Sequence, residues 1–221
     1  MKFPNAYNGI SKIFLAEILS IFAAIAAIVG AVLLVAGVDV AKQSTEVSVS
    51  GFSIGGGIFI LATCIIGLVS LILYILGLSR AAKDEKAFKS ALTAVLVGII
   101  ASIVAGIFAN NAFVYTFATV IGKFAELIAF FYCISGICNL AALMQNQDLT
   151  DRSMSLMKIV CVILVASAIL IIVSAFLPAM NPLTSFFTIF SSICSIVAYI
   201  MYLVILSRAK KALAEYKGTE E

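Results

Sequence analysis

The chain has 221 residues, of which 63% are hydrophobic and 11% are charged, and its formal net charge is +3. A soluble domain of this length cannot bury so much apolar surface, so the composition excludes a water-soluble fold and indicates lipid as the solvent. The chain contains no histidine, the most common general base and metal ligand, and its basic clusters flank apolar segments, which argues against nucleic-acid binding.

Six apolar segments follow one another along the chain, and each is close to the length of about 20 residues that a membrane-crossing helix needs. We therefore predict an all-α polytopic membrane protein with six transmembrane helices, folded as a single membrane domain over residues 1–221. The predicted spans are residues 13–38, 55–79, 90–109, 123–144, 156–177 and 186–207.

The first span, residues 13–38, is longer than the core of a signal peptide, roughly 7–15 residues, so we expect it to be retained. The polar, glycine-rich residues 39–57 that follow predict a long outer loop. Residues 51–55 of this loop fit the GxSxG pattern of serine hydrolases, but that chemistry needs a histidine partner, which the chain lacks. We predict that the protein is not an enzyme and that it has no catalytic, cofactor-binding or metal-binding residues.

The connection between the third and fourth spans is unusual because it is apolar. Asn110 and Asn111 end the third span, and residues 112–122 are too short to cross the membrane on their own. Two alternatives remain open for this segment. It forms a helix in the outer interface, or it extends the fourth span as a tilted helix.

Basic residues are distributed unequally between the connections. Twelve of the 14 lie in four segments, and the three other connections hold only Lys42 and Lys123. Because positively charged flanks stay on the cytoplasmic side, we predict a protein of the plasma (inner) membrane with cytoplasmic N- and C-termini. The twelve residues are Lys2, Lys12, Arg80, Lys83, Lys86, Lys89, Arg152, Lys158, Arg208, Lys210, Lys211 and Lys217.

Two helix ends that lie far apart in the chain resemble each other. Residues 71–83 and 199–211 match at seven of 13 positions, including Tyr74 with Tyr202 and a shared Leu-Ser-Arg-Ala run. The two segments are 128 residues apart, and half of this offset brings Asn139 of the fourth span to the position of the two tyrosines. Chance similarity between stop-transfer ends is the alternative to an internal repeat.

The repeat predicts three parallel hairpins, related by an axis along the membrane normal, because a unit with an even number of spans returns to its starting side. It also predicts that Tyr74, Asn139 and Tyr202 lie at similar depth in equivalent environments. The predicted hairpins are residues 10–79, 88–144 and 155–208.

A few polar side chains lie in or near the predicted spans, where charge is costly unless a partner or water reaches it. Hydrated positions at the interface are one interpretation, and a polar path or ligand contact inside the bundle is the other. Arg80 and Arg208 are the partners expected for Glu17, and the spacing of three between Lys123 and Glu126 favours a pair on one helix face. The candidate polar-path or ligand-contact residues are Glu17, Lys123, Glu126, Asn139, Tyr74 and Tyr202.

The third span carries Ala94, Gly98, Ser102 and Gly106 at four-residue spacing. Small residues at this spacing let helix backbones approach closely, either within the chain or against a second subunit. The first interpretation predicts packing against a neighbouring helix, and the second predicts a homo- or hetero-oligomer. The lipid bilayer is the other expected partner.

Two classes of function fit these features. The repeat and the few buried polar groups favour a transport component for a small solute or ion that needs partner subunits. The small-residue stripes and the scarcity of charge at mid-depth favour a non-catalytic membrane assembly or interaction protein. Of the two, the sequence slightly favours transport.

Overall fold

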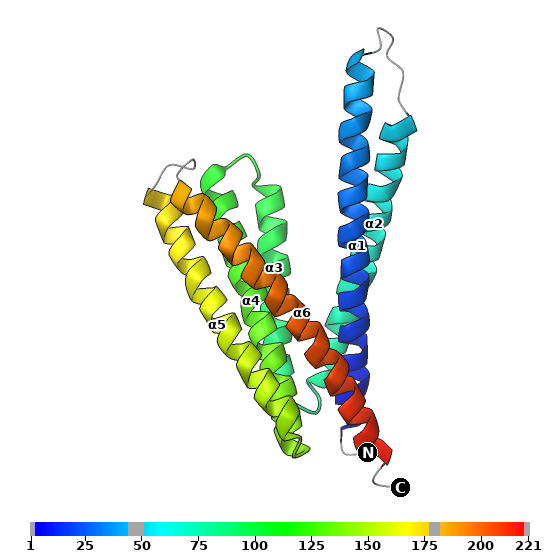
Figure 1. The fold of residues 1–221 in the computed structure, drawn as a ribbon, viewed down its shortest axis with the longest axis vertical. Helices are drawn as coiled ribbons and strands as arrows, with labels where there is room; N and C mark the ends of the chain where they lie inside the picture. The colour runs from blue at the N-terminus through cyan, green and yellow to red at the C-terminus, as the bar shows by residue number, and fades with distance from the viewer. Residues whose placement is uncertain (1–2, 44–50, 177–181, 219–221) are drawn as a thin grey trace. The chain divides into compact units, whose positions relative to one another are not determined.

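The computed structural model describes residues 3–43, 51–176 and 182–218, and all regular secondary structure in these ranges is α-helical. Lipid offers no hydrogen bonds to the backbone, so apolar spans fold as helices that satisfy their backbone groups internally. The prediction of an all-α fold is confirmed. The helices are α1 (Pro4–Gln43), α2 (Gly51–Ala81), α3 (Lys86–Ile107), α4 (Ala112–Leu143), α5 (Gln147–Phe176) and α6 (Pro182–Gly218) (Figure 1).

Four stretches of the described helices are long and apolar enough to cross a membrane, and they belong to α1, α2, α3 and α4. Large apolar side chains cover their outer faces, such as Ile58 and Leu61 of α2, which are 64% and 65% exposed. Such surfaces are suited to acyl chains and not to water. The four stretches are Pro4–Ala36, Ile54–Ala81, Lys86–Ile107 and Phe113–Leu143.

The chain divides into two compact units, and the predicted single membrane domain of three hairpins stays a prediction. The hairpin unit comprises Ser11–Gly77, which is most of α1 and α2. The main unit comprises Met1–Ile10 and Leu78–Glu221, which adds the first turns of α1 and the end of α2 to helices α3–α6.

The hairpin unit depends on a close approach between α1 and α2, which run side by side (Figure 1). A Cβ atom placed on Gly56 would lie 2.9 Å from the carbonyl oxygen of Gly30 and 2.7 Å from Cγ of Leu34. Two facing glycines thus remove the side chains that would hold the backbones apart, as small residues do in membrane helices generally.

Hydroxyl groups add polar contacts along the same seam. The Ser70 hydroxyl donates to the carbonyl oxygen of Ala16 over 2.8 Å and lies 2.8 Å from the Ser20 hydroxyl. The Thr63 hydroxyl lies 3.4 Å from the carbonyl oxygen of Ala23. These bonds satisfy polar side chains that would otherwise face lipid, and they fix the register of the two helices.

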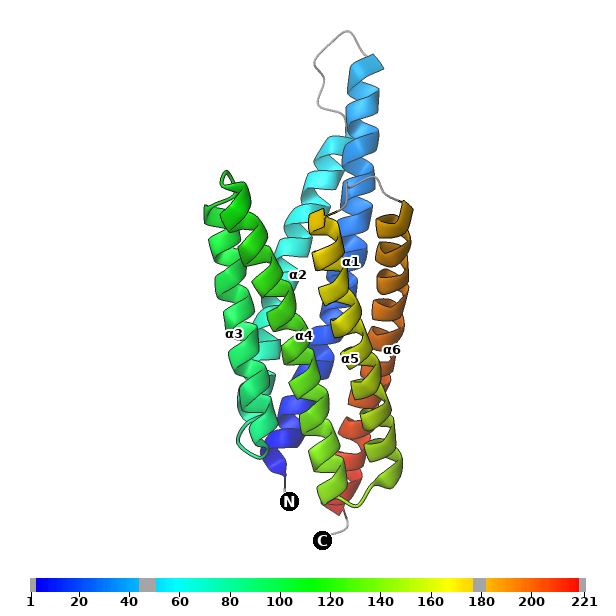
Figure 2. The same ribbon diagram turned by 90° about the vertical axis from the view of Figure 1, so that its left-hand side faces the viewer.

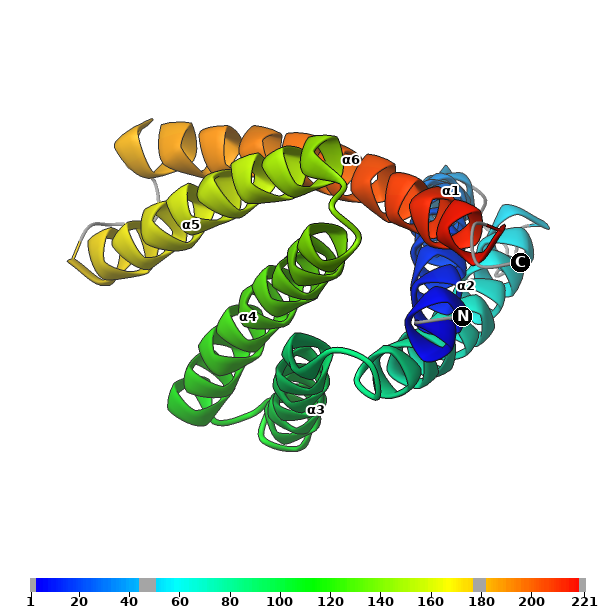
Figure 3. The same ribbon diagram turned by 90° about the horizontal axis from the view of Figure 1, so that it is seen from below.

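In the main unit, α4 packs against α3, α5 and α6. Figure 2 shows the four helices in the order α3, α4, α5, α6, and Figure 3 shows α3 beside α4 and α5 beside α6 from below. The interior between them is mostly aliphatic and aromatic. The largest fully buried side chains of the main unit are Ile10, Leu78, Phe88, Ile134, Ile137, Leu140, Leu156, Val160, Tyr202, Ile205 and Leu206.

Two of the predicted connections differ in the structure. The first loop was expected over residues 39–57, but α1 continues to Gln43 and α2 begins at Gly51. The glycines at positions 51, 55, 56 and 57 are therefore helical, and Gly56 lies against α1. Residues 112–122 form the first part of α4, so they extend the fourth predicted helix, and its tilt in the membrane stays a prediction. Asn111 caps this helix, and its side-chain oxygen accepts the backbone N–H of Val114 over 3.2 Å.

The turn between α4 and α5 consists of three residues and satisfies the free backbone groups of both helices. The N–H of Asn146 bonds to the carbonyl of Ala141 over 2.9 Å, and the N–H of Gln145 bonds to that of Ala142 over 3.0 Å, which is the Schellman pattern. The side-chain oxygen of Asn146 then accepts the N–H of Leu149 over 3.1 Å and caps α5.

Gln145 occupies the left-handed position of this turn, with φ of 56°, where glycine is preferred. We expect Gln145→Gly to raise the free energy of unfolding by about 0.5–1 kcal/mol, because glycine removes the Cβ strain of this conformation. Equilibrium unfolding in mixed micelles measures the change, with Gln147→Gly at the first position of α5 as the control. A destabilising effect at residue 145 would contradict the assignment of the turn.

Part of the small-residue stripe of α3 packs against α4 of the same chain. Cβ atoms placed on Gly98 and Gly122 would lie 3.6 Å and 3.7 Å from side chains of the opposite helix, and the Ser102 hydroxyl is 3.9 Å from the Cβ position of Gly122. Gly106, by contrast, has open space around its Cβ position. The structure therefore shows the close approach of α3 and α4 through Gly98 and Ser102, and the oligomer interpretation stays a prediction.

Candidate functional site

Polar side chains of the main unit gather where α1 begins, α2 meets α3, α4 meets α5, and α6 ends. We call this region the basic end. The ring of Phe3 lies 6.3 Å from that of Tyr216, which brings the two described ends of the chain together. Four segments that the basic-residue distribution assigned to one side of the membrane thus meet in the structure. Side-chain contacts of Asn5, Asp84, Glu85, Asn139, Asp148 and Arg208 join them.

Asp84, in the connection between α2 and α3, caps the first helix of the chain. Its two carboxylate oxygens accept the backbone N–H of Ala6 over 2.7 Å and the side-chain amide of Asn5 over 2.9 Å. A carboxylate at a helix N-terminus satisfies free N–H groups and interacts favourably with the helix dipole. The next residue, Glu85, caps α3 through Ala87 and also accepts the Asn139 amide over 3.1 Å. These two adjacent acidic residues therefore bond the connection between α2 and α3 to residues of α1, α3 and α4.

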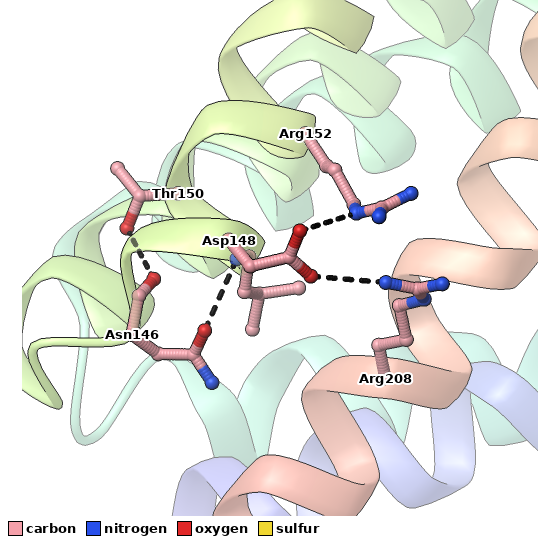
Figure 4. A network of polar contacts seen from close by, with 6 residues as sticks. Asn146, Asp148, Thr150, Arg152 and Arg208 are labelled. Atoms are coloured by element: carbon pink, nitrogen blue, oxygen red, sulfur yellow. Dashed lines mark hydrogen bonds and ion pairs between the residues drawn. The ribbon is translucent and has the colours of Figure 1, made fainter.

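Asp148, in the first turn of α5, lies at the centre of a second polar cluster (Figure 4). One carboxylate oxygen accepts a hydrogen bond from Nε of Arg152 over 2.9 Å, and the other accepts one from an Nη atom of Arg208 over 3.0 Å. Figure 4 shows the two guanidinium groups converging on the carboxylate from α5 and α6. One acidic residue is shared by two basic residues, so the trio carries one net positive charge.

The hydrogen bond from Arg152 lowers the pKa of the Asp148 carboxyl below its ordinary value, and the charges of Arg152 and Arg208 add to this effect. A carboxyl with a lowered pKa in the folded state stabilises the fold above its unfolded-state pKa, and this contribution is lost as the pH falls. We expect Asp148→Asn to lower the unfolding midpoint at pH 7, with the difference from the unmodified protein shrinking between about pH 5 and pH 3. Unfolding scans across this range measure it, and a difference independent of pH would contradict the ion pairs.

A small open pocket lies beside this cluster, at the turn between α4 and α5 and the last turns of α6. Its volume is about 200 Å³. Asn146 and Glu215 supply polar atoms to its wall, and Lys211 lies 3.8 Å from the Glu215 carboxylate. The lining residues are Met144, Asn146, Ala212, Glu215 and Tyr216. Among the described residues, no group of three histidine, cysteine, aspartate or glutamate side chains lies close enough together to hold a metal ion.

The residues predicted to form a polar path are dispersed. Tyr202 is fully buried, its hydroxyl lies 3.1 Å from Sγ of Cys133, and its ring lies 4.4 Å from that of Phe130. Lys123 and Glu126 are both exposed on α4, and these two described residues form no ion pair with each other. Asn139 is exposed at the basic end.

Glu17 and Tyr74 are half-buried and belong to the hairpin unit. Arg208, one of the two partners expected for Glu17, binds Asp148.

The three positions that the repeat aligns do not share one environment. Tyr202 is fully buried, Tyr74 is half-buried, and Asn139 is exposed and bonded to Glu85. The Leu-Ser-Arg-Ala runs at 78–81 and 206–209 do match, because in both the leucine and alanine are buried and the serine and arginine are exposed. The likeness thus holds between two helix ends of the main unit, and the threefold repeat stays a prediction.

Sequence reasoning missed Asp84, Glu85 and Asp148, which organise the basic end. The four-residue spacing from Asp148 to Arg152 is a recognisable signal for an ion pair on a helix. The longer-range bonds of Asp84 and Glu85 carry no local signal, because they depend on how the helices meet.

Comparison of the chain with models of protein families, with curated proteins and with solved structures found no match.

Proposed function

We propose that this chain is a six-span integral protein of the plasma (inner) membrane with cytoplasmic termini, and that it acts as a non-catalytic assembly or interaction protein. The unequal distribution of basic residues supports the orientation, and the meeting of the four basic-flanked segments at one end supports a common side for them. The lengths of α5 and α6 are consistent with two further spans.

The main support for this function is that the interior of the main unit is apolar whereas its basic end has a polar surface. The described interior of the main unit consists of side chains such as Ile134, Ile137 and Val160, and the buried Tyr202 hydroxyl contacts Cys133. The hydroxyl of Ser153, nearer the basic end, is buried without a described partner. A path for a hydrated solute needs a run of accessible polar groups. An interaction protein needs a polar surface at the membrane boundary, and the basic end offers one.

Photo-crosslinking in the native membrane tests this proposal. A photoreactive residue at Lys211 or Glu215, both largely exposed at the basic end, is expected to give protein adducts of discrete mass. The matched control position is Ile103 of α3, which is 55% exposed on an apolar face, and it is expected to give lipid adducts. Absence of protein adducts at both basic-end positions in a folded, expressed protein would contradict the proposal.

Transport, the function that the sequence slightly favoured, remains the second candidate because of the open pocket beside Glu215. A solute path would have to continue from this pocket past the buried Leu156 and Val160 of α5. In a variant without native cysteines, Leu156→Cys and Val160→Cys should resist a small water-soluble thiol reagent. Rapid reaction at both positions would favour transport over interaction.

A further inference from the structure

The arrangement of Arg152 and Arg208 around Asp148 leaves most of their hydrogen-bonding capacity unused. Each guanidinium has five N–H donors in a planar fork. Arg152 donates one hydrogen bond to Asp148, from Nε, and Arg208 donates one, from an Nη atom. Their side chains are 50% and 45% exposed, so the remaining donors are accessible. Two guanidinium groups held side by side with free donors favour an anion with several oxygens, above all a phosphate.

The surface next to Arg208 is apolar and continues along the same face of α6. Val204 and Ile200 precede Arg208 by one and two steps of four residues, and they are 44% and 56% exposed. Residues at this spacing lie on one face of a helix. A phosphate bound at Arg208 would therefore have an apolar strip of α6 directly beside it. A free phosphate ion makes no favourable contact with such an apolar strip, whereas the acyl chain of a phospholipid can pack against it.

We propose that Arg152 and Arg208 bind the headgroup phosphate of an anionic phospholipid, whose acyl chain lies along Val204 and Ile200. Asp148 holds the two guanidinium groups side by side and lowers the net charge of the site by one. This inference rests on the proposed membrane topology, which places the site at the boundary of the bilayer. It does not depend on a protein partner.

Lipid retention by the purified full chain tests the site. The protein is placed in nanodiscs of phosphatidylcholine with a small fraction of phosphatidylglycerol, and native mass spectrometry counts the phosphatidylglycerol retained after gentle release. Arg152→Gln and Arg208→Gln should each weaken retention about fivefold, which corresponds to about 1 kcal/mol for one basic residue near anionic lipid. Arg208→Lys should also weaken it, because lysine keeps the charge and loses the planar fork.

The matched control is Lys89→Gln, which removes an exposed cation from the first turn of α3, a helix that does not pack against α5 or α6. It should change retention by less than about twofold, because its charge lies outside the site.

Equal losses in Arg152→Gln, Arg208→Gln and Lys89→Gln would indicate a general surface charge and overturn the site. Displacement of phosphatidylglycerol by millimolar inorganic phosphate would assign the arginines to a soluble phosphate and overturn the lipid source. Neither result affects the crosslinking test of the interaction function, so the two proposals fail separately.

Discussion

Alanine at Gly56 should destabilise the hairpin unit by about 1–3 kcal/mol, the range typical of an overpacked contact. The added methyl group would lie 2.7 Å from Cγ of Leu34 and 2.9 Å from the carbonyl oxygen of Gly30. Leu34 can rotate away, but the backbone of Gly30 can move only if α1 and α2 separate. Separation would also lengthen the bonds of Ser70 to Ala16 and of Thr63 to Ala23.

Gly57→Ala is the matched control, because nothing lies within 4 Å of the Cβ position of Gly57. Alanine is the better helix former by about 1 kcal/mol in water, so this control should be neutral or stabilising. Equilibrium unfolding of both variants in mixed micelles measures the difference. Equal effects of the two substitutions would show that the close approach of Gly30 and Gly56 does not stabilise the hairpin.

Alanine at Gly136 should destabilise the main unit by a similar amount, about 1–3 kcal/mol. Its Cβ atom would lie 2.7 Å and 2.8 Å from two ring atoms of Phe88, which is fully buried on α3. A buried ring in a packed interior has no free rotamer to adopt, so α3 and α4 must shift apart.

A double-mutant cycle isolates this contact. Gly136→Ala should cost less in a Phe88→Leu background, with a coupling energy of at least about 1 kcal/mol, because the shorter side chain vacates the space of the methyl group. Gly106→Ala, on an open face of α3, is the control and should be neutral. Additive effects of the changes at residues 88 and 136 would contradict the contact.

Helices were predictable from the sequence because lipid imposes one secondary structure on a long apolar run. Their ends were less predictable. Residues 51–57 contain four glycines, a composition that predicts a loop, yet they belong to α2. Glycine breaks helices in water, but between membrane helices it allows close packing. The partner of Gly56 lies on another helix, so no local pattern shows which role a glycine has.

The polar contacts were predictable only where they were local. The spacing of Asp148 and Arg152 follows the helical i,i+4 rule, whereas Arg208 reaches Asp148 from 60 residues away through the packing of α5 on α6. Lys123 and Glu126 had a favourable spacing and form no ion pair with each other, because exposed side chains gain little from a fixed pairing. Spacing thus shows which residues share a face, and packing decides whether they meet.

Side-specific labelling of two positions in one protein tests the proposed topology most directly. In a variant without native cysteines, Lys83→Cys lies in the connection between α2 and α3 at the basic end, and Asn110→Cys lies at the turn between α3 and α4. Both positions are exposed, and α3 separates them. A membrane-impermeant thiol reagent applied to intact cells should label residue 110 at once and residue 83 only after permeabilisation. Labelling of residue 83 in intact cells, or of both positions from the same side, would contradict the orientation and the membrane-spanning role of α3.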